Sequence, residues 1–292
     1  MFVRDVKPWV QFWALLGMML ACFVIMSVPQ VFTVVLGVDM DVDGLRWMQL
    51  LSSLIGFACP AWLWAFLFHD ASSRPLGGRF GWRYWGLALG GVACWVLLMP
   101  FSSILTEWNA GWHLPAALGA MEEALRNITK AGEEMLEDFC MQSGLANLLF
   151  NLLVLAVAPA VCEELFFRGA LQSTLGRALR NPHWAILVTA ILFSALHGDI
   201  FGFMPRLLMG LVLGYLYLYG GSIVVNMVAH FVNNATVVVF YYLYYKGIVA
   251  MSPTDNVILP WWVVVASLVL SVALFVLIFV IKRKSSAEKS VI

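Results

Sequence analysis

The feature that most constrains this chain is a series of long apolar runs with almost no charge, such as VVVASLVLSVALFVLIFVI near the C-terminus. A helix that crosses a membrane needs about 20 mostly apolar residues. Hydrophobic residues make up 62% of the 292-residue chain and charged residues 12%, whereas a soluble domain is about half apolar and about a quarter charged. The sequence therefore predicts an all-α, multi-pass membrane protein.

We expect about eight membrane-spanning helices, and the pattern is also compatible with seven or nine. The fifth and sixth apolar runs are the shortest, so their lengths are the least well defined. Together the spans are typical of a polytopic helix bundle. The expected spans are Trp9–Leu36, Trp47–Phe68, Tyr84–Leu105, Leu145–Phe167, Trp184–His197, Met204–Tyr219, Ser222–Tyr245 and Pro260–Ile281.

A long acidic segment, from Glu107 to Gly144, separates the third and fourth spans. Its apolar residues recur at helical spacing, which predicts an amphipathic helix in the outer loop. Such a helix would either cover an opening or serve as a solvated connector, and the connector is the simpler interpretation. The apolar positions are Leu118, Met121, Leu125 and Ile128.

Charge is balanced over the whole chain but uneven between loops. Lys and Arg together number 17, as do Asp and Glu, so no net positive field favours nucleic acid as a partner. Basic residues gather in every second loop and acidic residues in the loops between, which predicts that both termini are cytoplasmic. The expected location is a bacterial cell membrane. The basic positions are Arg74, Arg79, Arg83, Arg168, Arg177, Arg180 and Lys282–Lys284, and the acidic ones include Asp39, Asp41 and Asp43.

Several ionisable and amide side chains lie inside or beside the apolar runs. Burying a charge at membrane depth costs at least about 2.5 kcal/mol unless it is paired or faces water, so each is a candidate for function. A hydrogen-bonding network that only packs the helices is the simpler alternative for any one of them. The residues are Glu163, Glu164, Arg168, His197, His230, Asn233 and Asn234, followed by Asn147, Asn151 and Asn226.

Three of these charges lie in one short stretch, VCEELFFRGA. In an α-helix Glu164 and Arg168 are four residues apart on one face, in the order that favours an ion pair. Glu163 is rotated by about 100° from Glu164 and cannot share that arginine equally. A carboxylate left without a cation in an apolar setting, beside a like charge, accepts a proton readily and suits a general base.

The histidines follow a similar spacing. Phe193 and His197 are four residues apart in the fifth span, and His230 and Asn234 are four apart in the seventh, so each pair shares a helix face. A carboxylate, two imidazoles and a carboxamide could ligate a metal, activate water, or relay protons. The absence of HExxH and GxSxG weakens zinc and serine chemistry. The five scattered cysteines, including Cys162, are interpreted as buried apolar residues.

Three motifs therefore occur in order within apolar spans, and together they resemble those of the CPBP intramembrane protease family, also called Abi or CAAX prenyl protease 2-like. One such motif alone is common on soluble helices, but three in family order are a specific signal. The resemblance covers about residues 147–245, whereas the first three spans and the acidic loop resemble the family only in general character and carry none of the three motifs. The motifs are EExxxR (Glu163, Glu164, Arg168), FxxxH (Phe193, His197) and HxxxN (His230, Asn234).

The resemblance implies an intramembrane glutamic endopeptidase that uses no metal or other cofactor. Glu163 would take a proton from a water molecule that His197 orients or shares. His230 and Asn234 would donate hydrogen bonds to the oxyanion, and Asn233 is an alternative to Asn234 that fits the motif less well. Supporting roles fall to Glu164, Arg168 and Phe193, with the first two holding the helix and tuning the base.

The resemblance also divides the chain into residues 1–144 with the first spans and acidic loop, a catalytic core at 145–245, and residues 246–292 with the last span and basic tail. The expected partners are membrane lipid and a protein or peptide substrate, with or without a lipid modification. Prenylated substrates are not carried over from the eukaryotic members. A catalytically silent scaffold or bacteriocin-immunity protein is the main alternative, and a proton-coupled transporter is a weaker one.

Overall fold

The computed structural model describes residues 6–37, 40–69, 76, 82–142, 144–253, 255 and 259–288, without side-chain detail at 30, 32–34, 82–83, 279 and 281–288. Helices are the only regular secondary structure in these ranges. The all-α fold predicted from the sequence is therefore confirmed.

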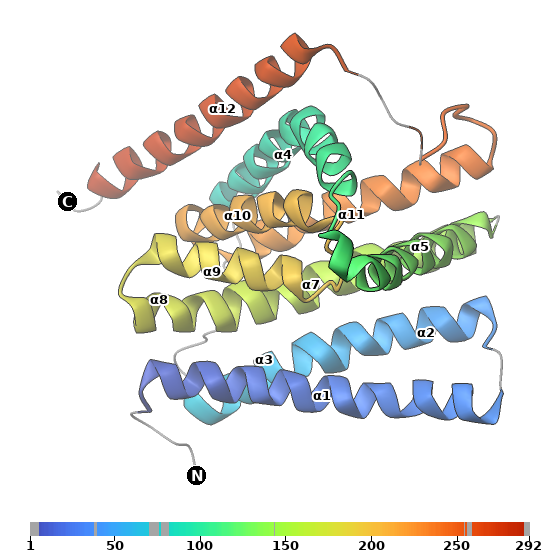
Figure 1. Ribbon diagram of the computed structural model, residues 1–292. Coiled ribbons are helices and arrows are strands. Elements are labelled where there is room, and N and C mark those ends of the chain that lie inside the picture. The colour runs from blue at the N-terminus through green and yellow to red at the C-terminus, as the bar shows by residue number, and fades with distance from the viewer. Residues whose placement is uncertain are drawn as a thin grey trace.

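The helices are labelled in chain order in Figure 1. Three π-helical segments, η1, η3 and η4, interrupt longer helices, and one short 3₁₀ helix, η2, precedes α5. The bounds are α1 Pro8–Leu36, α2 Val42–Ser53, η1 Leu54–Ala58, α3 Cys59–Phe68, α4 Trp82–Ala110, η2 Ala116–Leu118, α5 Gly119–Met141, α6 Leu145–Leu152, η3 Leu153–Val157, α7 Ala158–Glu164, η4 Leu165–Gln172, α8 Ser173–Leu179, α9 Pro182–Ala195, α10 Phe203–Gly220, α11 Ile223–Tyr245 and α12 Trp261–Glu288.

The long helices run roughly side by side as a bundle (Figure 1). Helix α1 packs against α3 and α8 on one side of the bundle, and α12 packs against α4 on the opposite side. Between them, α10 packs against α9, α4 and α11, while α11 also contacts α7 and η3. The helices that carry the sequence motifs, α7, α9 and α11, therefore lie in the interior layers of the bundle.

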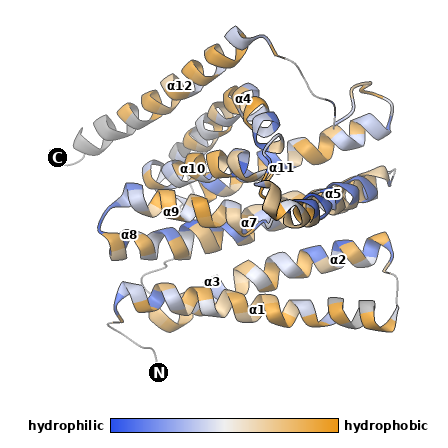
Figure 2. Ribbon diagram, in the orientation of Figure 1, coloured by the Kyte–Doolittle hydropathy of each residue, from blue (hydrophilic) through white to orange (hydrophobic). Residues whose placement is uncertain are grey.

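Seven helical stretches within the described ranges are long and apolar enough to cross a membrane, and Figure 2 shows apolar residues along them while α5 is the most polar helix. The fifth predicted span, Trp184–His197, corresponds to α9, which has only 14 residues. A helix of that length rises about 21 Å, less than the roughly 30 Å hydrocarbon core. This chain is thus a multi-pass membrane protein in which one apolar helix is too short to cross alone.

The central helix is longer than the sequence suggested. Helices α6, α7 and α8 and their π segments form one continuous stretch of 35 residues, Leu145–Leu179. The prediction that the fourth span ends at Phe167 and that Arg168 belongs to the following basic loop is wrong, because the helix continues and Arg168 is fully buried. Glu163 lies near the middle of this stretch, beside a π segment of the kind that is frequent at functional sites.

Most of the basic residues used to predict orientation lie beyond what the structure describes. Asp39, Arg74 and Arg79 fall outside the described residues, and the side chains of Arg83 and of Lys282–Lys284 are not described either. Arg177 lies on α8 and Arg180 directly follows it. The cytoplasmic placement of both termini therefore stays a prediction.

The helix predicted in the acidic outer loop is present as α5. Met121 and Ile128 are exposed, as is Leu118 in the preceding turn. The residues of α5 that are buried lie near its C-terminal end, at Phe139 and Cys140, where the helix packs against α11, α6 and α2.

Glycines bring α9 and α10 into close contact. A Cβ atom at Gly210 would lie 3.0 Å from Cα of Ala190, and one at Gly214 would lie 2.6 Å from Cγ2 of Ile186. Gly86 and Gly90 on α4 are four residues apart, as Gly210 and Gly214 are, but their surroundings differ. A Cβ at Gly90 would meet the end of a flexible side chain on α12, and one at Gly86 would meet nothing within 4 Å. Of these four glycines, Gly210 therefore lies at the close approach of two backbones, and Gly214 packs against a side chain of α9.

We expect Gly210→Val to destabilise the protein by about 1–3 kcal/mol, because overpacking forces α9 and α10 apart. Gly86→Val makes the same chemical change at an open position and serves as the control. Thermal unfolding of the purified protein in detergent, followed by tryptophan fluorescence, measures both. Equal effects of the two substitutions would contradict the close approach at Gly210.

Candidate active site

A buried ion pair on the central helix anchors the candidate site. Arg168 and Glu164 are both fully buried, and Nη1 of Arg168 donates to Oε1 of Glu164 at 2.7 Å. Nη2 of Arg168 donates to the backbone oxygen of Gly210 at 3.2 Å. The ion pair expected from the four-residue spacing is confirmed, and it also links the central helix to α10.

Glu164 has a second partner that its position in the sequence did not indicate. Nδ1 of His230, on α11, lies 2.9 Å from the same Oε1 of Glu164. Because an ionised carboxylate only accepts hydrogen bonds, Nδ1 of His230 donates and Nε2 is left as the free edge of the ring. Glu164 therefore orients His230 directly, whereas the sequence had suggested that it acts on Glu163.

Glu163 has a different environment from its neighbour. The residue is 8% exposed, and its buried Oε2 has no hydrogen-bond partner in the described part of the chain. Nε2 of His230 lies 3.9 Å from Oε2, which is too long for a direct hydrogen bond. Both atoms are nevertheless close enough to contact the same small molecule. Glu164 is thus paired and, among the described residues, Oε2 of Glu163 is not, while their separate roles stay a prediction.

His197 lies in the turn that follows α9. Its Nδ1 is 2.7 Å from the backbone oxygen of Phe193, and a carbonyl oxygen only accepts, so Nδ1 carries the proton and Nε2 is a free acceptor. Phe193 is buried between the other groups, with its ring 5.0 Å from the ring of His197 and 6.0 Å from that of His230. The guanidinium carbon of Arg168 lies 4.9 Å from the same ring, so Phe193 keeps the two histidines and the arginine apart.

The side chains of the two asparagines on α11, Asn233 and Asn234, are hydrogen-bonded to each other. Oδ1 of Asn234 accepts a hydrogen bond from Nδ2 of Asn233 at 2.8 Å. Nδ2 of Asn234 donates to the backbone oxygen of Leu155 at 3.2 Å, on the central helix. These contacts leave one N–H of Asn234 available to a bound molecule, and they make Asn233 a neighbour that orients Asn234.

These side chains open onto one cavity of about 350 Å³. Glu163, His197, His230 and Asn234 all line it, although they come from different parts of the sequence. Glu164 and Arg168 lie behind its wall, and His197 is exposed. The remaining lining residues are Gln49, Trp95, Ser102, Leu155, Pro159, Phe193, Pro205, Arg206, Met209 and Asn233.

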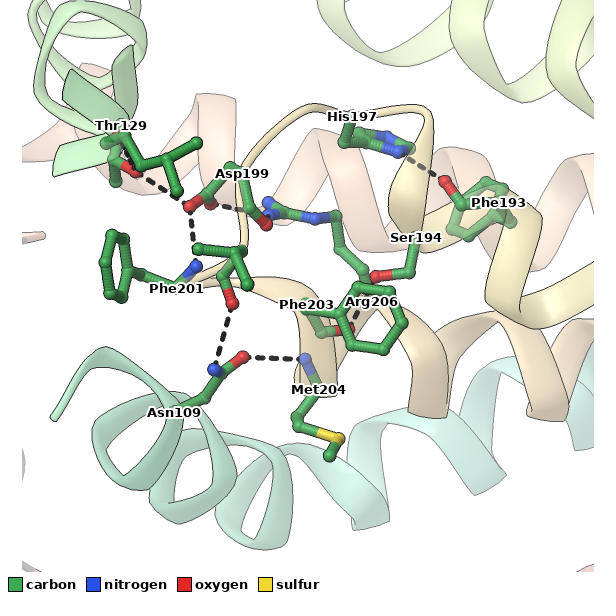
Figure 3. A network of polar contacts seen from close by, with 12 residues as sticks. Asn109, Thr129, Phe193, Ser194, His197, Asp199, Phe201, Phe203, Met204 and Arg206 are labelled. Carbon is green, nitrogen blue, oxygen red and sulfur yellow. Dashed lines mark hydrogen bonds and ion pairs between the residues drawn. The ribbon is translucent and has the colours of Figure 1, made fainter. Parts of the chain in front are cut away.

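The sequence motifs did not include Arg206 or its partner Asp199, which form a salt bridge (Figure 3). Burial raises the pKa of Asp199, but hydrogen bonds from Arg206 and Thr129 outweigh it and hold the pKa below its usual value. The available signal was an arginine near the start of an apolar span, seven residues after an aspartate. Gln49 and Ser102 carried no signal, because uncharged residues at membrane depth are common.

Other polar residues singled out in the sequence have packing roles. Asn151 donates to the backbone oxygen of Phe139 at 2.6 Å, and Asn226 donates to that of Leu213 at 2.6 Å. Asn147 accepts from the buried Arg46 at 3.2 Å. All five cysteines are free, and four are buried. In the ranges that the structure describes, no three His, Cys, Asp or Glu side chains lie close enough together to hold a metal ion.

We expect Arg168→Met to cost about 3–5 kcal/mol of stability, because it leaves Glu164 as an uncompensated buried charge. The double variant Glu164→Gln with Arg168→Met should be less destabilised than Arg168→Met alone, since no unpaired charge remains. Lys130→Met, which breaks an exposed pair on α5, is the control. Unfolding temperatures in detergent measure all three, and a double variant less stable than Arg168→Met would contradict the argument.

Comparison with known proteins identifies the segment that holds the site. Residues 145–236 match the model of the family described as "Type II CAAX prenyl endopeptidase Rce1-like". A Bacillus subtilis (strain 168) protein, "Uncharacterized protein YyaK", is 34% identical over 101 residues, which cover 32% of this chain and 34% of that relative. The match thus spans about a third of each protein. No solved structure matches the chain.

The matched segment begins with the central helix and contains all of Glu163, Arg168, His197, His230 and Asn234. The family expected from the three motifs and the family found by comparison are both families of CAAX prenyl proteases. Residues 145–236 of this membrane protein are therefore similar to the Rce1-like family of type II CAAX prenyl endopeptidases.

Proposed function

We propose that this protein is an intramembrane glutamic endopeptidase that hydrolyses a peptide bond in a membrane-associated or lipidated protein or peptide without a metal ion. The observation that carries the proposal is the environment of Glu163. Its Oε2 is buried without a hydrogen-bond partner among the described residues, in the wall of a cavity shared with His197, His230 and Asn234. An unpaired buried acceptor that faces a cavity is unfavourable unless a ligand or water satisfies it.

The first chemical step uses Glu163 as a general base. Its carboxylate takes one proton from water, and the water oxygen forms a bond to the carbonyl carbon of the scissile peptide. Nε2 of His197 has the free lone pair needed to orient that water, because Nδ1 donates to Phe193. The π electrons of the carbonyl move to its oxygen, which becomes the oxyanion of a tetrahedral intermediate.

Asn234 and His230 stabilise the oxyanion in this scheme. One N–H of Asn234 is available, and Nε2 of His230 becomes a donor when the ring carries a second proton. One oxyanion donor typically contributes about 2.7–4 kcal/mol to transition-state stabilisation. Collapse of the intermediate breaks the C–N bond, and the proton held by Glu163 passes to the departing amine.

Glu164 and Arg168 support the proposed reaction from behind the cavity wall. The carboxylate of Glu164 holds Nδ1 of His230 at 2.9 Å, as the aspartate of a catalytic triad holds its histidine. Arg168 keeps that carboxylate in place at 2.7 Å. The two adjacent glutamates therefore have separate tasks, one on the water and one on the oxyanion donor.

A catalytically silent scaffold or bacteriocin-immunity protein would need the same ion pair for folding. It would have no use for a second, unpaired carboxylate facing the cavity, and this favours the peptidase. The chemistry of the family suggests a lipidated substrate. The distribution of basic residues among the loops supports cytoplasmic termini, and we place the protein in a bacterial cell membrane. We include both assignments in the proposal.

We expect Glu163→Gln to lower kcat at least about 100-fold, because the amide cannot accept the proton. The assay uses the purified protein in lipid nanodiscs with a farnesylated peptide ending in a CAAX tetrapeptide, alongside the unfarnesylated peptide. Glu134→Gln, at an exposed site on α5, is the control. Membrane proteomics of peptide ends in cells carrying wild type or Glu163→Gln extends the search to other substrates. Cleavage that persists in folded Glu163→Gln would exclude the glutamate mechanism.

We also expect the peptidase activity to survive EDTA and 1,10-phenanthroline, because the proposed nucleophile is activated by side chains. The measurement is the cleavage rate of the same peptide before and after dialysis against each chelator. A protein that loses activity on chelation and recovers it with added zinc would require a metal mechanism instead.

A further inference from the structure

The loop that carries His197 is held by an extended polar network. Helix α9 ends at Ala195 after 14 residues, and α10 begins at Phe203. The intervening backbone lies at the end of a helix too short to cross the membrane core. Backbone groups of a non-helical segment that are buried need hydrogen-bond partners outside a regular helix.

Asp199 lies at the centre of this network (Figure 3). Its Oδ1 accepts hydrogen bonds from Oγ1 of Thr129 at 2.8 Å and from the backbone N of Phe201 at 3.0 Å. Nη2 of Arg206 donates to Oδ2 of Asp199, and to its backbone oxygen at 2.7 Å. One residue of the loop is thereby connected to both α5 and α10.

The rest of the loop is fixed from α4 and α9. Asn109 is fully buried; its Nδ2 donates to the backbone oxygen of Ile200 at 3.0 Å, and its Oδ1 accepts from the backbone N of Met204 at 2.7 Å. Oγ of Ser194 donates to the backbone oxygen of Phe203 at 2.6 Å. These bonds satisfy backbone groups at both ends of the loop (Figure 3).

Two glycines allow the backbone of the loop to adopt this conformation. Gly198, directly after His197, has a φ of 71°, which favours glycine strongly over other residues. A Cβ atom at Gly202 would lie 2.5 Å from Oδ2 of Asp199 and 2.6 Å from Nη2 of Arg206. The backbone of the loop is therefore shaped around the contact between the aspartate and the arginine.

His197 depends on the loop for its position. Its ring has one hydrogen bond within the described part of the chain, to Phe193 in its own turn, and the residue is exposed. Arg206, by contrast, lines the same cavity as His197 and Glu163. A shift of the loop would move Nε2 of His197 relative to Glu163, and a misplacement of about 1 Å can cost about 100-fold in rate.

We propose that Asp199 and Arg206 are positioning residues, whose ion pair sets the place of His197 in the cavity, and that Thr129 connects α5 to this loop. The proposal rests on the peptidase function proposed above. It assigns α5 a structural link to the site, which a simple connector between spans would not need.

The kinetic test compares Asp199→Asn, Arg206→Gln and the double variant with wild type, using the farnesylated peptide in nanodiscs. We expect each single variant to lower kcat by about 10- to 100-fold with little change in KM. The double variant should lose no more than the worse single variant, because the residues act as a pair. In a His197→Ala background, Asp199→Asn should have no further effect on the residual rate. An equal fold-loss with and without His197 would overturn the proposal.

Two matched controls separate positioning from general damage. Removing both charges of the exposed pair Lys130–Glu134, also on α5, should leave kcat unchanged. At position 129, Thr129→Ser keeps the hydroxyl and should preserve kcat, whereas Thr129→Val removes it and should lower kcat. Identical behaviour of the serine and valine variants would exclude the link through α5.

Hydrogen–deuterium exchange gives a readout that does not depend on catalysis. In Asp199→Asn and Arg206→Gln, peptides covering 196–202 should exchange faster, while peptides covering α11 should not change. Unchanged protection of the loop would overturn the proposal that the Asp199–Arg206 ion pair holds it, even in an active enzyme. If the variants lose protection but the wild-type protein cleaves no peptide, the structural role of the Asp199–Arg206 pair is supported and the peptidase function is rejected instead.

Discussion

The structure depends on a fully buried ion pair, Glu164 with Arg168, in the middle of a 35-residue apolar helix. Two charges at that depth are tolerated because each is paired with the other. Arg168 reaches across to the backbone of α10, and Glu164 reaches across to His230 on α11. The pair therefore fixes how three helices meet, and the cavity forms where they meet.

The same pair explains why two adjacent glutamates differ. Glu164 is committed to a cation and to an imidazole, so its position is determined by two partners. Glu163 points into the cavity, where Oε2 has no partner among the described side chains. In the proposed reaction, this arrangement keeps a base available inside an apolar bundle without leaving two like charges unpaired.

The loop after α9 has backbone groups that need hydrogen-bond partners. A short helix leaves backbone groups exposed near its end, and Asn109, Ser194, Asp199 and Arg206 provide hydrogen bonds to them. None of these residues belongs to the three sequence motifs. These polar groups thereby hold the loop that carries the histidine of the proposed reaction, which connects the stability of the loop to the geometry of the site.

The sequence by itself determined the membrane class, the helical fold and the motif residues, because long apolar runs and four-residue spacings are local properties of a helix. It also anticipated the Glu164–Arg168 pair, whose members lie on one helix face. Only the tertiary structure decided that Glu164 holds His230, that α9 ends short of a full span, and that Arg206 joins the cavity wall. The contact between Glu164 and His230 links residues that are 66 positions apart, and the contact between Arg168 and Gly210 links residues that are 42 apart. Helix packing, which no local periodicity encodes, brings these residues together.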